Sequence, residues 1–451
     1  MLSEYQVENS ADYLGGSWFN EIYKTLFGFN VSKDENNENL DHRRKHHDNN
    51  VKLKADFYST YKNWNDLQWT IEIYMGVFYR MDLLVDTASD WVVVEGAGCT
   101  TCDGNKYDIS ASLDDGSAKK VSTEPSERTY GDVYFLGDIY NDNVCLNFSA
   151  CIAIDFFYIT EQRGLKEPID GILGMARNYP PQHLSEVESV QPGPLFVNEL
   201  WREGLLEDPV FALYLDKQNE QSWIDFGATD TSILRANESL EPIRMLERDF
   251  FWSQYNQAIA IGDTQLENVF RWCPPEDGSH DRREIQNDGS IYSIFDTSSP
   301  FLEISSLYYD SFINEIFAKM PGVGWRFGLN RRVVTECNID LFPSLYLMFD
   351  DKWIEVSPEN YIQVDPDDIE CMLMIRPMEA RFNVYGLPVL MDYYTEWNMK
   401  EDTLSFAPHK SSTKSVIVGE GPLPPDLSQT QCLQPVSFCD SKSSIVDPNW
   451  Y

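Results

Sequence analysis

One short motif occurs twice in this chain, and it constrains the fold more than any other feature. Residues 83–89 read LLVDTAS and residues 293–299 read SIFDTSS, so each copy is an apolar run followed by Asp-Thr, a small residue and Ser. A second element also recurs, because GILG at 171–174 and VYGLP at 384–388 follow the two motifs at similar distances along the chain. This internal repeat predicts two homologous lobes that are built in the same way.

Each copy of the motif supplies one carboxylate, Asp86 and Asp296. A single Asp-Thr-small-Ser string is typical of a turn or a helix N-cap, but two copies in the same surroundings favour a shared site. Two neighbouring carboxylates cannot both ionise cheaply, so they share a proton. The ionised member can then take a proton from water while the other hydrogen-bonds to a substrate carbonyl. We therefore expect acid–base hydrolysis that uses no metal and no cofactor.

The distribution of apolar and turn-forming residues along the chain predicts an all-β fold. From residue 69 onward, short apolar runs rich in β-branched and aromatic residues alternate with Gly, Pro, Asn and Asp. This pattern is typical of many short strands. Segments with a helical period are scarce, and the better candidates are residues 194–206 and 306–320.

Shifts in composition predict the domain boundaries. Residues 1–65 form a polar leader, 66–215 a first lobe, 216–410 a second lobe, and 411–451 an irregular extension rich in Pro and Ser. The leader carries a basic cluster, so one function for it is as an inhibitory pro-segment that pairs with the site carboxylates. No processing site is legible in it.

Charge and hydropathy exclude several classes of partner. The net charge of −38 disfavours binding to nucleic acid or to an anionic membrane surface. No apolar run approaches the ~20 residues that a membrane-spanning helix needs. We expect a monomer whose partner is a peptide or an unfolded protein substrate.

Cysteines and glycosylation sequons favour a lumenal, lysosome- or vacuole-like, or secreted location. No signal peptide is visible in the N-terminal residues MLSEYQVENSADYLGG, and this argues against a lumenal or secreted location. The sequons begin at Asn30, Asn147 and Asn237. The clustering of the nine cysteines suggests the pairs Cys99/Cys102, Cys145/Cys151, Cys337/Cys371 and Cys432/Cys439, which leaves Cys273 over.

The candidate metal-binding residues do not form a ligand set. His42, His46 and His47 lie in the polar leader, where a solvated surface is the simpler interpretation. The CTTC string at 99–102 lacks the second CxxC or the nearby His that a zinc site needs. A loop disulfide is the better interpretation of CTTC.

Over residues 65–410 the chain resembles the pepsin-like aspartic peptidases. RTYGDVYFLGD (128–138) resembles the flap hairpin that closes over the cleft, and DGILGMA (170–176) resembles the strand beneath the first catalytic loop. YGLPVLMDYYTEWNMKEDTLSFAPH (385–409) resembles the C-terminal strands of that family. The resemblance implies a bilobal all-β fold with two barrel-like lobes and an active-site cleft between them.

The resemblance also implies roles for individual residues. Asp86 and Asp296 would be catalytic, Thr87 and Thr297 would exchange hydrogen bonds across the lobes, and Ser89 and Ser299 would bond the outer carboxylate oxygens. Tyr130 and Gly131 would form the flap tip. The pairs Cys99/Cys102 and Cys337/Cys371 fall where the family has disulfides.

The chain departs from the family motif Asp-Thr-Gly-Ser/Thr at the glycine of both copies. Ala88 stands there in the first copy and Ser298 in the second. The leading hypothesis is an aspartic endopeptidase that works at acidic pH. The alternative is a catalytically impaired protein that binds peptides or proteins in the retained cleft. A two-carboxylate glycoside hydrolase is disfavoured because it does not explain the duplicated motif.

Overall fold

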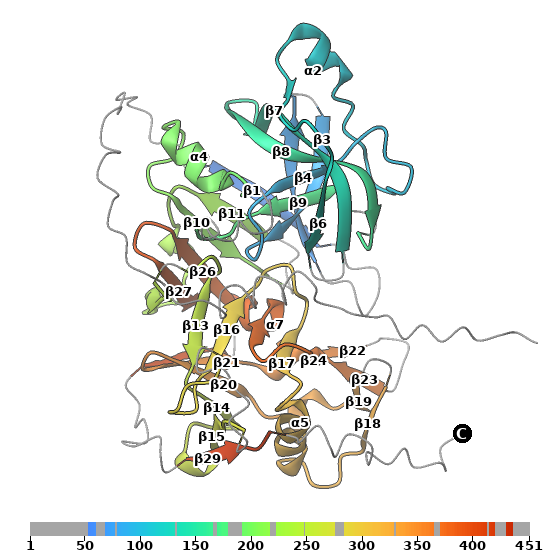
Figure 1. Ribbon diagram of the computed structural model, residues 1–451. Coiled ribbons are helices and arrows are strands. Elements are labelled where there is room, and N and C mark those ends of the chain that lie inside the picture. Colours follow the sequence, from blue (N-terminus) through green and yellow to red (C-terminus); the bar gives the residue numbers. More distant parts are fainter. Residues whose placement is uncertain are drawn as a thin grey trace, which may run out of the picture.

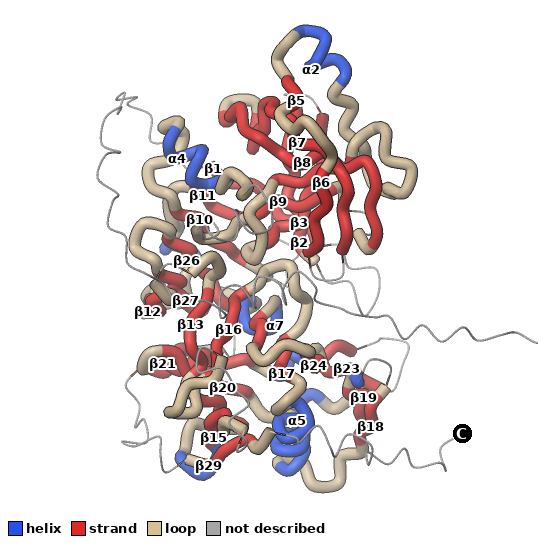
Figure 2. The backbone as a smooth tube through the Cα atoms, viewed as in Figure 1, coloured by secondary structure: helices blue, strands red, loops and turns tan. Residues whose placement is uncertain are grey.

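The protein is mostly β-strand and forms two lobes, one above the other in Figures 1 and 2. This confirms the predicted bilobal all-β fold. The computed structural model describes residues 53–59, 68–76, 79–130, 133–165, 169–178, 192–216, 222–247, 249–275, 284–328, 331–364, 370–412, 415–419 and 430–435. The three histidines of the leader, and Gly131 at the expected flap tip, lie outside these residues, whereas residues 53–59 of the predicted leader form a strand.

Six strands of the N-terminal lobe close into a barrel, in which each strand pairs with the next and the last returns to the first. Alternate side chains of β2 and β3, such as Ile71, Ile73 and Leu83, are fully buried inside it. The order around the barrel is β2 (Trp69–Met75), β3 (Tyr79–Asp86), β9 (Gly171–Gly174), β4 (Val92–Glu95), β8 (Ala150–Arg163) and β7 (Val133–Asn147). The short strands β5 (Lys119–Lys120) and β6 (Ser126–Tyr130) add to β7, and helix α2 (Ser110–Asp115) lies in the same lobe.

A continuous sheet connects the two lobes. It runs from the barrel strand β2 through β1 (Leu53–Ser59), β11 (Ser222–Phe226), β10 (Val210–Tyr214), β26 (Tyr393–Asn398) and β27 (Thr403–Pro408) to β12 (Glu241–Arg244). Aromatic rings pack on this sheet, with Phe211 stacked on Trp397 at 5.6 Å and Trp252 edge-on to Trp397 at 5.2 Å. Strands distant in sequence therefore share one buried base.

The C-terminal lobe consists of three further sheets. The first holds β13 (Ser253–Asn256), β16 (Ile291–Phe295), β25 (Asn383–Tyr385), β17 (Leu302–Ser305) and β24 (Ile375–Met378). The second holds β28 (Ile417–Gly419), β21 (Lys352–Val356), β20 (Leu345–Phe349), β14 (Ala258–Ile261), β15 (Val269–Trp272) and β29 (Gln431–Leu433). The third holds β18 (Trp325–Phe327), β19 (Val333–Glu336), β23 (Glu370–Leu373) and β22 (Ile362–Val364).

The two expected helices are present but shorter than the predicted ranges. α4 (Phe196–Arg202) ends just before Gly204, whose φ of 75° is left-handed. α5 (Tyr309–Ala318) buries one face on the C-terminal lobe and ends before the Pro-Gly pair at 321–322. The single-turn helices α6 (Pro358–Tyr361) and α7 (Leu387–Leu390) lie in the same lobe.

The structure confirms three of the four expected disulfides and corrects the fourth. Cys432 bonds to Cys273 rather than to Cys439, and Cys439 lies outside the described residues. The reason is that β29 pairs in parallel with β15, which places Cys432 beside Cys273 although the two are 159 residues apart in sequence. The confirmed bonds are Cys99–Cys102, Cys145–Cys151 and Cys337–Cys371.

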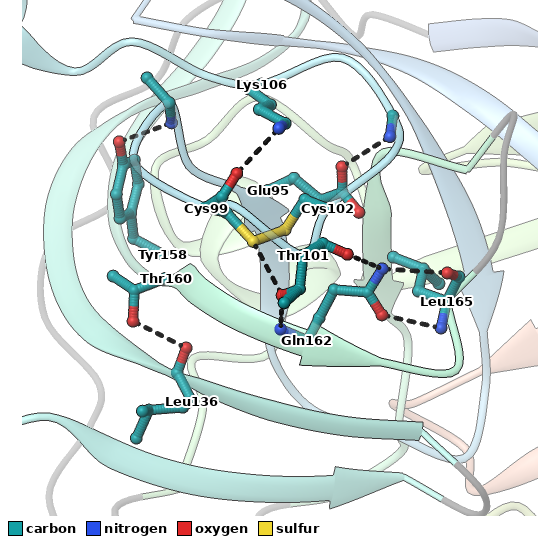
Figure 3. The surroundings of a disulfide bond; sticks show 12 residues. Glu95, Cys99, Thr101, Cys102, Lys106, Leu136, Tyr158, Thr160, Gln162 and Leu165 are labelled. Atoms are coloured by element: carbon teal, nitrogen blue, oxygen red, sulfur yellow. Dashed lines mark hydrogen bonds between the residues drawn. A yellow bond between two sulfur atoms is a disulfide. The ribbon is translucent and has the colours of Figure 1, made fainter.

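The CTTC loop is closed by its own disulfide (Figure 3). Lys106 Nζ donates to the carbonyl of Cys99 at 2.8 Å, and the backbone N–H of Gln162 donates to Thr101 Oγ1 at 2.8 Å. The described residues contain no group of three or more His, Cys, Asp or Glu side chains placed to bind a metal. In the same part of the chain, no helix has the length and apolar character needed to cross a bilayer.

Candidate active site

The two copies of the motif form equivalent loops at the ends of equivalent strands. Asp86 is the last residue of β3, and Asp296 directly follows β16. In each lobe the later Gly element inserts as a central strand. β9 pairs in parallel with β3 and antiparallel with β4, just as β25 does with β16 and β17. The internal repeat in the sequence is therefore a repeat in topology.

The recurring glycines are needed because backbone crosses them closely. A Cβ on Gly174 would lie 2.6 Å from the backbone nitrogen of Trp91. A Cβ on Gly386 would lie 2.2 Å from the carbonyl oxygen of Ser299. Real Cβ contacts are not this short, so both positions exclude a side chain and hold the catalytic loops against the strand beneath.

The two threonines join the loops through four buried hydrogen bonds with two-fold symmetry. Thr87 N–H donates to Thr297 Oγ1 at 3.2 Å, and Thr297 N–H donates to Thr87 Oγ1 at 3.1 Å. Each hydroxyl then donates to a carbonyl of the other lobe, Thr87 to Phe295 at 3.0 Å and Thr297 to Val85 at 2.7 Å. All donors in this set are satisfied, so the loops are held rigidly in one register.

The two carboxylates face each other across this junction, and each residue is only 5% exposed. Backbone N–H groups hold the Oδ1 atoms, from Ala88 to Asp86 and from Ser298 to Asp296, both at 2.8 Å. Burial raises the pKa of Asp86, and a hydrogen bond with Asp296 is among the interactions that oppose this rise. Burial and then the Asp86 charge raise the pKa of Asp296 to about 8. The geometry therefore favours one shared proton.

The two motif serines do not occupy equivalent positions. The Ser89 hydroxyl lies close enough to Asp86 to lower the pKa of that carboxyl, although it forms no well-aligned hydrogen bond with any of the described residues. Ser299 was expected to bond Asp296, but its hydroxyl donates to Glu303 Oε1 at 2.6 Å. Glu303 is an acidic residue of the first sheet of the C-terminal lobe, and its charge also contributes to the raised pKa of Asp296.

The two residues that replace the motif glycines are compatible with their backbone, because neither is among the residues with positive φ. Ala88 is 3% exposed and its methyl packs in an apolar cluster with residues such as Phe250 and Phe382. Ser298 differs, because its hydroxyl donates to Asp296 Oδ1 at 2.7 Å and is also within hydrogen-bonding range of Asp86. Only the second replacement adds a polar group to the dyad.

Tyr130 ends β6, opposite Val133 in the hairpin with β7. Its side chain is buried beside Phe135, with ring centroids 5.8 Å apart. The charge of Asp86 is among the influences that raise the pKa of Tyr130, so the phenol lies within electrostatic range of the dyad. The structure thus packs Tyr130 in the apolar cluster of the first lobe that contains Trp91, close to the loop of Asp86.

Sequence reasoning missed Asp90 and Arg128, two buried charged residues beside the first loop. Asp90 directly follows Ser89, and Arg128 lies two residues before Tyr130. Their positions in the sequence were the signal that could have found them, because Asp90 adjoins the first motif and Arg128 adjoins the predicted flap tip.

The sequence is similar to one family profile and to several known proteins. The profile of the family described as "Eukaryotic aspartyl protease" matches residues 68–409. "Vacuolar protease A" of Aspergillus fumigatus is 29% identical over 58% of this chain, and the match spans 60% of that protein. "Pepsin B" of Canis lupus familiaris is 22% identical over 78% of this chain and 83% of its own length. For "Pepsin A" of Sus scrofa the identity is 22%, and the match covers 72% of this chain and 77% of that protein.

Proposed function

This chain belongs to the eukaryotic aspartyl protease family, and we propose that it is an endopeptidase in which Asp86 and Asp296 share one proton and activate water. The observation that carries the proposal is the buried pair of carboxylates at a two-fold junction of hydrogen-bonded threonines. The substrates are peptides or unfolded protein segments that reach the pair in extended form.

In the proposed reaction the ionised carboxylate accepts a proton from water as the water oxygen attacks the scissile carbonyl carbon. The protonated carboxyl donates its proton to the carbonyl oxygen, which gives a neutral tetrahedral diol. As the diol collapses, one of its hydroxyls gives a proton to the ionised carboxylate, while the other carboxyl donates its proton to the leaving amine nitrogen. The C–N bond breaks, and a carboxylic acid and an amine leave.

Rigid placement supports the proposal, because proton transfer needs donor and acceptor atoms within about 3 Å of the reacting atoms. The crossed threonine bonds and the close glycine contacts hold both loops without help from a ligand. Burial favours the singly protonated pair, since it disfavours a second negative charge. Asp86 and Asp296 are equivalent by topology. Their surroundings differ, because the Ser298 hydroxyl bonds Asp296 and the charge of Glu303 also acts on it.

The replacement of both motif glycines suggests a second candidate function, which is peptide binding without cleavage. The Ser298 hydroxyl favours this second function, because its hydrogen bond to Asp296 Oδ1 competes with the attacking water for that oxygen. Both functions use the same pair of carboxylates, so a binding measurement alone does not separate them.

The sequons at Asn237 and Asn147 are proposed sites of N-linked glycosylation if the chain enters the secretory pathway. Asn237 is exposed in a turn with a φ of 67°, and Asn147 precedes the exposed Phe148 in the β7–β8 hairpin. The sequon at Asn30 lies outside the described residues.

Digestion of acid-denatured haemoglobin tests the proposed function. We expect new peptides at acidic pH, and we expect a statine-containing peptide, which mimics the tetrahedral diol, to block their appearance at a stoichiometry of one per chain. Calorimetry with the same statine peptide provides the second reading. Inhibitor binding without digestion between about pH 2 and pH 7 would sink the endopeptidase proposal in favour of peptide binding alone.

A further inference from the structure

Arg128 is a buried cation in the flap strand. It lies in β6 two residues before Tyr130, so the two side chains lie on the same face of the strand. Arg128 is only 8% exposed, and its guanidinium lies 4.4 Å from the ring centroid of Trp91 and 5.1 Å from that of Phe157. Both rings are fully buried, so the charge is stacked inside an apolar cluster.

A cation in such surroundings needs a compensating charge, because an unpaired buried charge is strongly destabilising. Asp90 provides it from the catalytic loop, four residues after Asp86, and is 6% exposed. Burial raises the pKa of Asp90, and the charge of Arg128 is the largest influence that opposes this rise. Asp90 Oδ2 also accepts a 2.7 Å hydrogen bond from the backbone N–H of Gly193.

Arg128 also interacts with the flap tyrosine itself. Its guanidinium hydrogen-bonds to the Tyr130 hydroxyl, and its charge lowers the pKa of that phenol while burial raises it. A single side chain therefore connects Tyr130, the ring of Trp91 and the carboxylate of Asp90. The last two belong to the loop that carries Asp86.

The C-terminal lobe contains the same chemistry without a flap. Phe301 follows Asp296 by the same interval at which Trp91 follows Asp86, and the Arg376 guanidinium lies 4.6 Å from its ring centroid. Arg376 pairs with Glu303 at 2.8 Å. Arg376 lies in β24 of the C-terminal lobe with its side chain 36% exposed, so it provides a control cation that stacks on the loop of the second motif instead of the first.

We propose that Arg128 is a positioning residue that holds the flap tyrosine Tyr130 against the loop of the first motif through its stack on Trp91, with Asp90 as the compensating charge. The kinetic part of this inference rests on the proposed endopeptidase function, while the structural part does not. Arg128 acts through Tyr130 and Asp90 and touches no reacting atom.

Hydrogen exchange tests the structural part on the full chain. We expect Arg128→Gln to speed exchange of the β6 backbone amides by about 10-fold or more relative to wild type, because local opening no longer breaks a buried pair. Arg376→Gln should leave β6 exchange within about 2-fold of wild type. Unchanged β6 exchange in Arg128→Gln, or equal acceleration in both variants, would overturn the positioning role.

Kinetics with a fluorogenic peptide test the link to substrate. Arg128→Gln should raise KM about 10-fold with a smaller fall in kcat, and Arg128→Lys should recover part of the loss because it keeps the charge without the planar stack. The double variant Asp90→Asn/Arg128→Gln should be no worse than either single change, since neither charge is then left unpaired. Losses that simply multiply would overturn the pairing.

Failure of the proposed function has a different signature. If wild type cleaves nothing, the same variants are compared by the dissociation rate of the statine peptide, which we expect Arg128→Gln to raise about 10-fold. Suppose that wild type cleaves nothing and that Arg128→Gln releases the inhibitor faster. This outcome rejects the proposed endopeptidase function but supports Arg128 as a positioning residue. Equal release rates reject Arg128 whatever the outcome for cleavage.

Discussion

Asp296→Asn is expected to lower kcat/KM for peptide cleavage by about 10³-fold or more, and Asp86→Asn by a similar factor. Either change removes a group that must exchange a proton during the reaction, while the amide keeps the size of the side chain and one hydrogen-bond acceptor for the backbone N–H at 2.8 Å. The double variant should be little worse than the singles, because the two carboxyls act as a unit. The measurement is initial rate on a fluorogenic peptide.

The control for the dyad variants is their stability. The pKa of Asp296 in the folded protein is raised to about 8 from an ordinary value of 3.8, so the folded state binds the proton more tightly than the unfolded state does. Its contribution to stability is present below the ordinary pKa and is lost as pH rises toward the folded value. Asn does not titrate, so Asp296→Asn should be at least as stable as wild type near neutral pH. Full activity in Asp296→Asn would contradict the account, and so would inactivity that comes with marked destabilisation.

A surface variant completes this comparison. Asp108→Asn changes an exposed carboxylate of the N-terminal lobe, which also carries Asp86, and should leave kcat/KM unchanged. Equal losses in Asp108→Asn and Asp296→Asn would show that net charge, and not the dyad, controls the rate.

Ser298→Gly is expected to raise kcat by about 10-fold, which is within the ~10²-fold that 1 Å of misplacement can cost. The reason is specific to the second lobe. The Ser298 hydroxyl donates to Asp296 Oδ1 at 2.7 Å, while the backbone N–H that also holds this oxygen remains in the variant. Removing the hydroxyl frees the carboxylate oxygen for the attacking water. Steady-state kinetics at the pH optimum provide the measurement.

Two matched variants separate the hydroxyl from the extra carbon. Ser298→Ala removes only the hydroxyl and should recover most of the gain. Ala88→Gly should change kcat little and cost about 1 kcal/mol of unfolding free energy, because the Ala88 methyl packs in an apolar cluster and places no polar group on the carboxylates. A larger gain in Ala88→Gly than in Ser298→Gly would reverse the assignment.

The sequence predicted the fold and the pairing of the two motif loops because the relevant information is repeated within the chain. LLVDTAS and SIFDTSS reappear as equivalent strand–loop units, and the glycines of GILG and VYGLP are required by close backbone contacts that admit no Cβ. Repetition turned two weak local patterns into one specific prediction. The crossed bonds of Thr87 and Thr297 follow from the same two-fold relation.

Features that depend on contacts between distant segments were not predictable in this way. The Cys273–Cys432 bond depends on the addition of β29 beside β15, which no local pattern announces. The Ser299 hydroxyl turns to Glu303 because an acceptor lies 2.6 Å away on the neighbouring strand. The stack of Arg128 on Trp91 likewise forms only after β6 packs against the first loop.

The pH dependence of kcat/KM for a fluorogenic peptide tests the central claim most directly, namely that Asp86 and Asp296 share one working proton. At low pH both carboxyls are protonated and no base is available, while above both pKa values no acid is available. We therefore predict a bell-shaped profile whose upper limb falls near pH 8, where the raised pKa of Asp296 lies. A profile with a single titration step, or no dependence on pH across this range, would contradict the shared-proton dyad.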